Sequence, residues 1–380
     1  MAAKKPKQVT KKALWGVVVF YLLIAFEIAY MAGPFAVYFY GVYNPILNFF
    51  NQSPVLSVLN NFFLPHAARE TSSALINIHE YIGAIFAIVG FGAFCIGACQ
   101  IYYSKFARKG AVTGGIYNLI RHPQYTSFAI CGFGLLLLWP RVINLFMYVT
   151  MLFVYYLLAK AEEKECEEKF GQIYMDYKNK TAMFLPFKSS FSKNLPALPK
   201  STGKKAAVLI CMYLLALAVT FSAAKGVTAY SVNSLYAVYT ENSATISVGE
   251  IDADKLAEII HIALSDNDVE SRIDRENGEA KFLNYVLPAE WYAAEVPMNG
   301  VEYKAGHRSP SDYDDTQYKI IFTIAEIREN TEAIGKEILT KVLTREPLIE
   351  VWIDLKEQSV IQILELPDHY KYQGIPVAVF

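Results

Sequence analysis

The chain of 380 residues is 54% hydrophobic and 19% charged, whereas soluble domains carry about 25% charged residues. This composition excludes a disordered chain and a fibre, and it favours a membrane protein. The net charge of −1 hides an asymmetry, because residues 1–226 hold 22 lysines and arginines against 9 acids, and residues 227–380 hold 13 against 27. The acidic half lacks the basic footprint of nucleic-acid-binding proteins, so we expect no nucleic-acid partner.

Five segments predict membrane-spanning helices, which need about 20 apolar residues each. They are Leu14–Tyr30, Ile78–Tyr102, Tyr125–Leu138, Val142–Leu158 and Ala206–Ala224. Lysines precede the first segment, and its apolar stretch is long enough to predict an uncleaved anchor. The third segment is short, and an earlier start near Ile116 is an alternative. Between the first two spans, residues 41–66 predict one or two short interfacial helices.

The basic residues predict the orientation of these spans, since lysine and arginine favour the cytoplasmic side. The N-terminus, residues 103–122 and residues 160–205 are rich in basic residues, whereas residues 33–76 contain only Arg69. We therefore expect an integral protein of a plasma or inner membrane with a cytoplasmic N-terminus. Five crossings would place residues 227–380 outside the cytoplasm.

The sequence divides into a membrane domain over residues 1–226 and an acidic, extracytoplasmic α+β domain over residues 227–380. The second domain has two expected helices, Asp252–Leu264 and Thr331–Val342. Its expected strands are Leu235–Val248, Lys281–Val286, Tyr318–Ile327, Ile349–Leu355 and Val360–Leu366. Their order predicts a small sheet with helices on one face. The five cysteines all precede residue 227, and they show neither a zinc spacing nor a haem attachment motif.

Two polar clusters flank the predicted hairpin at its cytoplasmic end. Because the two arms of a hairpin are antiparallel, we expect Arg121 and His122 to lie near Glu162 and Glu163. Ionisable groups at a membrane boundary are costly, so they usually pair with one another or have a function. The alternative is a snorkelling arginine among ordinary interfacial tyrosines.

Together these clusters resemble a motif of a membrane methyltransferase family. The family includes isoprenylcysteine carboxyl methyltransferases, phospholipid N-methyltransferases and small-thiol S-methyltransferases, and the likeness spans about residues 78–187. The matching residues are Gly115, Tyr117, Arg121, His122, Pro123, Tyr125, Glu162, Glu163, Phe170, Gly171, Tyr174, Tyr177 and Pro186. The chain departs from the pattern at Ser127, Cys166 and Met183.

This resemblance implies S-adenosylmethionine (SAM) as methyl donor, bound on the cytoplasmic side. The implied cofactor-binding residues are Gly115, Tyr117, Arg121, His122, Pro123, Tyr125, Glu162, Glu163, Tyr174 and Tyr177, and the implied catalytic residues are Arg121 and Glu163. Basic side chains suit the SAM carboxylate, a glutamate suits its ammonium or ribose, and tyrosine rings suit adenine and the sulfonium.

We therefore expect a SAM-dependent membrane methyltransferase, whose partners are membrane lipid and a lipophilic acceptor. A lipid amine, an isoprenoid or prenylcysteine carboxylate and a small thiol all fit as acceptors. One alternative is a non-catalytic scaffold subunit that retains the fold, with residues 227–380 facing a protein partner. A second is a sterol-type reductase, and a third is a haem protein using His79.

Overall fold

The computed structural model describes residues 36–107, 112–186, 199, 201–274, 280–301, 304, 306–328, 331–367, 370–376 and 378–380. The chain forms two compact units, one of residues 1–36, 83–138 and 147–209, and one of residues 37–82, 139–146 and 210–380. Within the described residues, three helical stretches are long and apolar enough to cross a membrane, at Ala74–Ile101, Val142–Phe170 and Thr202–Ser234. The span predicted at Leu14–Tyr30 lies outside the described residues.

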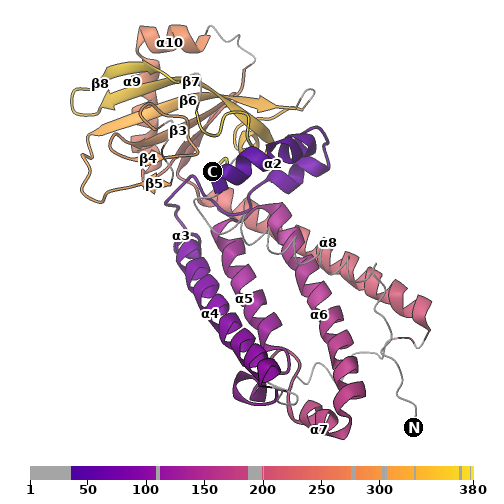
Figure 1. Cartoon of the computed structure of the whole chain (residues 1–380). Coiled ribbons are helices and arrows are strands. Elements are labelled where there is room, and N and C mark those ends of the chain that lie inside the picture. Colours follow the sequence, from indigo (N-terminus) through magenta and orange to yellow (C-terminus); the bar gives the residue numbers. More distant parts are fainter. Residues whose placement is uncertain are drawn as a thin grey trace. The chain divides into compact units, whose positions relative to one another are not determined.

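Among the described residues up to Ser234, six longer helices, one helix of a single turn and two short 3₁₀ turns precede the sheet (Figure 1). The helices are α2 (Ala36–Asn51), α4 (His79–Phe106), α5 (Pro123–Leu138), α6 (Val142–Phe170), α7 (Gln172–Lys180) and α8 (Thr202–Ser234), with turns η1 (Leu56–Asn60) and η2 (Gly115–Asn118). A short helix, α3 (Ala74–Asn77), precedes α4. Helix α5 begins no earlier than Pro123, because proline lacks an N–H and suits the first helical position.

Helices α4 and α5 approach closely through small residues. A Cβ atom added to Gly90 would lie 2.4 Å from the backbone nitrogen of Cys131 and 2.7 Å from the carbonyl oxygen of Ser127. A Cβ atom added to Gly134 would lie 2.3 Å from the backbone nitrogen of Ala87. Small residues let membrane helices pack backbone against backbone, and this contact holds the middle of α5 beside α4.

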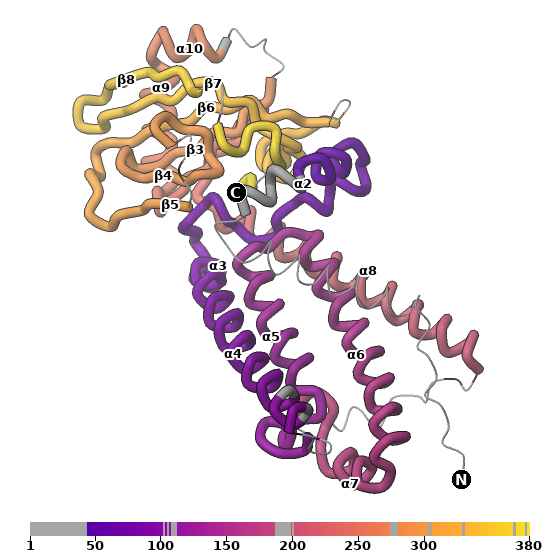
Figure 2. The backbone as a smooth tube through the Cα atoms, viewed as in Figure 1, coloured from indigo at the N-terminus to yellow at the C-terminus, as the bar shows by residue number. Residues whose placement is uncertain are grey.

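The C-terminal region forms a six-stranded sheet in the order β1-β2-β3-β6-β7-β8. Figure 2 labels β3, β6, β7 and β8 of this sheet. The strands are β1 (Ala237–Tyr239), β2 (Ser243–Ser247), β3 (Phe282–Pro288), β6 (Gln317–Ile327), β7 (Val342–Asp354) and β8 (Ser359–Glu365). Only β2 and β3 are parallel among these neighbours. A separate ribbon pairs β4 (Tyr292–Ala293) with β5 (His307–Arg308).

Both faces of this sheet are covered. Helix α9 (Ala253–Leu264) packs against one face, and α10 (Asn267–Asp274) follows it. Helix α11 (Glu337–Lys341) packs with the C-terminal Phe380 on the other face. The prediction of helices on one face is therefore wrong, because neighbouring residues of each strand point to opposite faces and both sets are apolar.

Two predicted elements differ from the structure. The helix predicted over Thr331–Val342 is only α11, because Gly335 takes a left-handed conformation (φ 57°) and β7 already begins at Val342. The strand predicted over Leu235–Val248 is a hairpin of β1 and β2, closed by a bond of 2.9 Å from the Thr240 N–H to the Ser243 carbonyl.

Candidate functional site

Backbone hydrogen bonds join the two halves of the motif. The N–H of Arg121 donates to the Ala182 carbonyl (2.9 Å), and the N–H of His122 donates to the Met183 carbonyl (3.1 Å). Helix α5 starts at the next residue, Pro123, so both side chains project from the helix entrance. The segment after α7 thereby fixes the position of Arg121 and His122.

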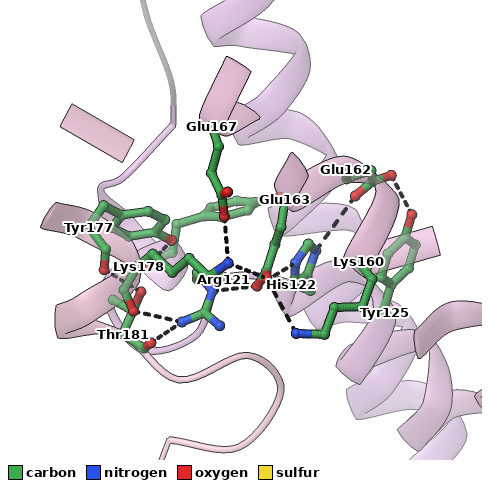
Figure 3. A network of polar contacts seen from close by, with 11 residues as sticks. Arg121, His122, Tyr125, Lys160, Glu162, Glu163, Glu167, Tyr177, Lys178 and Thr181 are labelled. Atoms are coloured by element: carbon green, nitrogen blue, oxygen red, sulfur yellow. Dashed lines mark hydrogen bonds and ion pairs between the residues drawn. The ribbon is translucent and has the colours of Figure 1, made fainter. Parts of the chain in front are cut away.

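Glu163 of α6 lies at the centre of a network of cations (Figure 3). Its side chain is 1% exposed, and its Oε1 lies 2.7 Å from Nε of Arg121 and 3.6 Å from Nε2 of His122. Its Oε2 lies 3.1 Å from Nζ of Lys178 and 3.8 Å from Nζ of Lys160. A buried carboxylate is stable only when cations and donors surround it, and this network meets that need.

Arg121 also binds the C-terminal end of α7. Its Nη1 donates to the carbonyl of Lys178 (3.0 Å) and to the carbonyl of Thr181. Unpaired carbonyls at a helix C-terminus attract cations, so this contact stabilises the end of α7. The chain turns from α6 into α7 at Gly171, whose φ of 56° is in the left-handed region that glycine tolerates.

Three aromatic rings stack beside the network. The rings of His122 and Tyr125 are 5.6 Å apart and nearly parallel, and those of Tyr125 and Tyr155 are 4.7 Å apart. Tyr125 donates its hydroxyl hydrogen to Glu162, whose side chain is 52% exposed. The half-exposed Glu162 carboxylate is therefore the acidic group of this cluster that faces outward.

Tyr117 contributes a buried hydroxyl to the same region. It lies in η2, which begins at Gly115, and its carbonyl accepts a hydrogen bond of 2.7 Å from the Tyr177 hydroxyl. Its own hydroxyl has no hydrogen-bond partner among the described residues, although the residue is only 5% exposed. Burial raises the pKa of Tyr117, so the group is a neutral donor. Tyr174 is buried next to Tyr177, with ring centroids 5.9 Å apart.

The electrostatics of His122 follow from its two acidic neighbours. Burial by itself lowers the pKa of His122, but Glu162 and Glu163 outweigh it and raise the pKa above the ordinary 6.5. The imidazole Nδ1 lies 3.6 Å from Oε2 of Glu162. Glu167 and Glu163 likewise raise the pKa of Lys178. The cluster therefore keeps its cations charged near neutral pH.

An apolar cavity of about 560 Å³ adjoins the stacked rings. It shares Tyr125 and Tyr155 with the ring stack described above. Its walls also include Phe86, Thr126, Ala129, Ile130, Phe133, Tyr148, Leu152, Phe184 and Leu185. A cavity with few polar groups suits a hydrocarbon-rich ligand.

Sequence reasoning did not single out Lys160, Lys178, Thr181 and Tyr155. An ordinary lysine-rich helix surface gives little reason to choose Lys178. Thr181 binds Arg121 through its backbone carbonyl, a group that every residue type carries. Ser127 is buried and its backbone faces Gly90 of α4, while Cys166 is half-buried on α6. The roles predicted for the matched residues in binding a cofactor stay predictions.

Comparisons with known proteins agree with the motif. Residues 80–173 match the family model described as phospholipid methyltransferase. A stretch of 77 residues is 32% identical to protein-S-isoprenylcysteine O-methyltransferase of Saccharomyces cerevisiae, covering 20% of this chain and 32% of that protein. The chain therefore spans about a third of the curated relative that it matches. No solved structure shows a significant match. The resemblance to membrane methyltransferases is confirmed over these residues.

Proposed function

We propose, from the phospholipid methyltransferase match over residues 80–173, that this chain is a membrane methyltransferase that transfers the methyl group of SAM to a lipophilic acceptor. The observation that carries the proposal is the apolar cavity of about 560 Å³ that shares Tyr125 with the buried Arg121–Glu163 network. The side chain of Tyr125 thus belongs both to the polar site and to the wall of the apolar cavity.

The residues present fit SAM as a ligand. The hydroxyl of Tyr117 is a buried donor without a hydrogen-bond partner among the described residues, and Nε2 of His122 lies beyond hydrogen-bond distance of Glu163. Buried polar groups are normally satisfied, so such groups suggest a ligand that completes them. SAM offers a carboxylate, an ammonium and a ribose diol as partners.

Each residue has a proposed task. Bound SAM would supply an electrophilic methyl group on its sulfonium. His122 would bind the SAM carboxylate as an imidazolium, and the half-exposed Glu162 would bind the ammonium or the ribose. The faces of Tyr125 and Tyr155 would contact the sulfonium region, since aromatic faces attract cations.

Arg121 and Glu163 are proposed as positioning residues. The carboxylate oxygens of Glu163 face Arg121, Lys178, Lys160 and His122, and Arg121 also binds two carbonyls at the end of α7. These contacts hold the entrance of α5 to the end of α7. Methyl transfer depends chiefly on alignment of acceptor and donor in a water-poor site, and this clamp would provide it.

The first test compares Tyr117→Phe with Tyr81→Phe, whose parent side chain is 70% exposed. Because the Tyr117 hydroxyl has no described partner, its removal should leave the thermal stability of the SAM-free protein unchanged. It should weaken SAM binding about fivefold in calorimetry of the detergent-purified protein, the effect of one neutral hydrogen bond of about 1 kcal/mol. Tyr81→Phe should bind SAM normally.

Equal SAM affinity of the two variants would remove Tyr117 from the site. Failure of the wild-type protein to bind SAM would overturn the proposed function, and binding of NADPH in its place would support the reductase alternative. A methylated product from a lipid extract, detected by mass spectrometry, would identify the acceptor class.

The sidedness of the membrane is part of the proposal. We propose that the SAM site faces the cytoplasm and that residues 227–380 lie outside it, because basic residues favour the cytoplasmic side. A cysteine at Ser311, in a background without the five native cysteines, should react with a membrane-impermeant maleimide in intact cells. Reaction only after lysis would overturn this topology.

A further inference from the structure

Two histidines and one glutamate converge in the unit that contains the sheet. Glu295 follows β4, His307 lies in β5, and His66 lies in the segment that leads into α3 and α4. One ligand atom of each lies within 4.8 Å of the others. Glu295 is 4% exposed, and both histidine side chains are nearly buried.

We propose that His66, Glu295 and His307 bind a divalent transition-metal ion of the zinc class, with water as the fourth ligand. Two imidazoles and one carboxylate are a ligand set typical of zinc with one open position. All three residues belong to a region that the methyltransferase match does not cover. The inference is therefore independent of the proposed function.

The distances between ligand atoms lie on either side of the separation that such an ion requires. Nε2 of His66 lies 3.7 Å from Oε1 of Glu295, and Nε2 of His307 lies 2.5 Å from Oε2 of Glu295. Tetrahedral zinc with bonds of about 2.1 Å separates neighbouring ligand atoms by about 3.3 Å. Binding would thus require small side-chain rotations and the loss of the proton between His307 and Glu295 to solvent.

Residues around the cluster resemble the outer shell of a metal site. Nδ1 of His66 is buried without a hydrogen-bond partner among the described residues, and it lies 3.7 Å from Oε1 of Glu80. A metal-binding histidine typically donates its other N–H to a carboxylate, and Glu80 is placed for that role. Nη1 of Arg69 lies 3.4 Å from Nδ1 of His307. The same Nη1 lies 2.9 Å from Oε2 of Glu80, and this ion pair offsets the charge of Arg69.

Apolar rings and a backbone bond limit the movement of His66. Its ring lies edge-on to Trp139 at 4.5 Å, and Phe62 stacks on it at 5.9 Å. The backbone N–H of His66 donates to the carbonyl of Phe380 (2.7 Å). Ligands held in this way lose little freedom on binding, and the ion would fasten the segment before α4 to the β4–β5 ribbon.

The experiment uses the full chain in detergent, washed with EDTA and dialysed against buffered ZnCl₂. We expect one tightly bound zinc per chain by mass spectrometry of the metal. Glu295→Gln and His307→Ala should lose this zinc, whereas His261→Ala, which changes an exposed histidine of α9, should retain it. Chelation should lower the unfolding temperature of the wild-type chain and leave that of Glu295→Gln unchanged.

A second measurement needs no variant. X-ray absorption of the zinc-loaded wild-type chain should show two imidazole ligands, and CoCl₂ should give the visible spectrum of a four-coordinate site. Absence of stoichiometric zinc in the wild-type chain, retention of zinc by Glu295→Gln, or a shell without imidazole would overturn the proposal. The cluster would then be a metal-free network of ion pairs.

Discussion

The close approach of α4 and α5 gives a quantitative prediction for Gly90→Ala. The new Cβ atom would lie 2.4 Å from the nitrogen of Cys131 and 2.7 Å from the carbonyl oxygen of Ser127. Both are backbone atoms, so no side-chain rotation relieves the contact and the two helices must separate. Overpacking of this kind costs about 1–3 kcal/mol.

Gly92→Ala is the matched control, because it lies in the same helix with no atom within 4 Å of an added Cβ. Both variants gain the helix propensity of alanine, about 1 kcal/mol relative to glycine. The difference between the two variants should therefore equal the packing cost alone, about 1–3 kcal/mol in favour of Gly92→Ala.

Unfolding in SDS, followed by circular dichroism of the detergent-purified variants, measures this difference. Membrane insertion of both variants is checked first, by resistance to alkaline extraction. Equal free energies of unfolding, or a more stable Gly90→Ala, would refute the close approach of α4 to α5.

Three other predictions concern the polar network and the N-terminus of helix α9. Arg121→Lys should lower the free energy of unfolding by about 3 kcal/mol, because lysine has no planar fork to bind Glu163 and the α7 carbonyls together; wild-type stability would contradict the clamp. The raised pKa of His122 means that its stabilisation is fully present below pH 6.5 and is lost as pH rises through the higher folded pKa. The unfolding temperatures of wild type and His122→Asn should therefore converge in alkaline buffer. A difference that does not change with pH would argue against stabilisation by the charged His122. Asp252→Ala removes the cap that accepts from Lys255 N–H (2.9 Å) and should cost about 1 kcal/mol, whereas Asp254→Ala should cost less.

The sequence by itself predicted that Arg121 and His122 lie near Glu162 and Glu163, which form the centre of the polar network. Arg121 and Glu163 are 42 positions apart, yet an antiparallel hairpin places its two ends together whatever its detailed packing. The motif spacing identified the methyltransferase likeness, and hydropathy identified the long apolar helices. These features depend on periodicity and on local order along the chain, which are visible without a fold.

Only the tertiary structure decided which residues distant in the sequence contact one another. Nothing in the pattern around Thr331–Val342 shows that the chain there packs on the opposite face from α9 and then continues as β7. Likewise, His66 lies more than 200 positions before Glu295 and His307 in the sequence. No local spacing therefore links the three residues. Contacts of this kind arise from how strands and loops pack, because the free energy that brings them together is spread over the whole core.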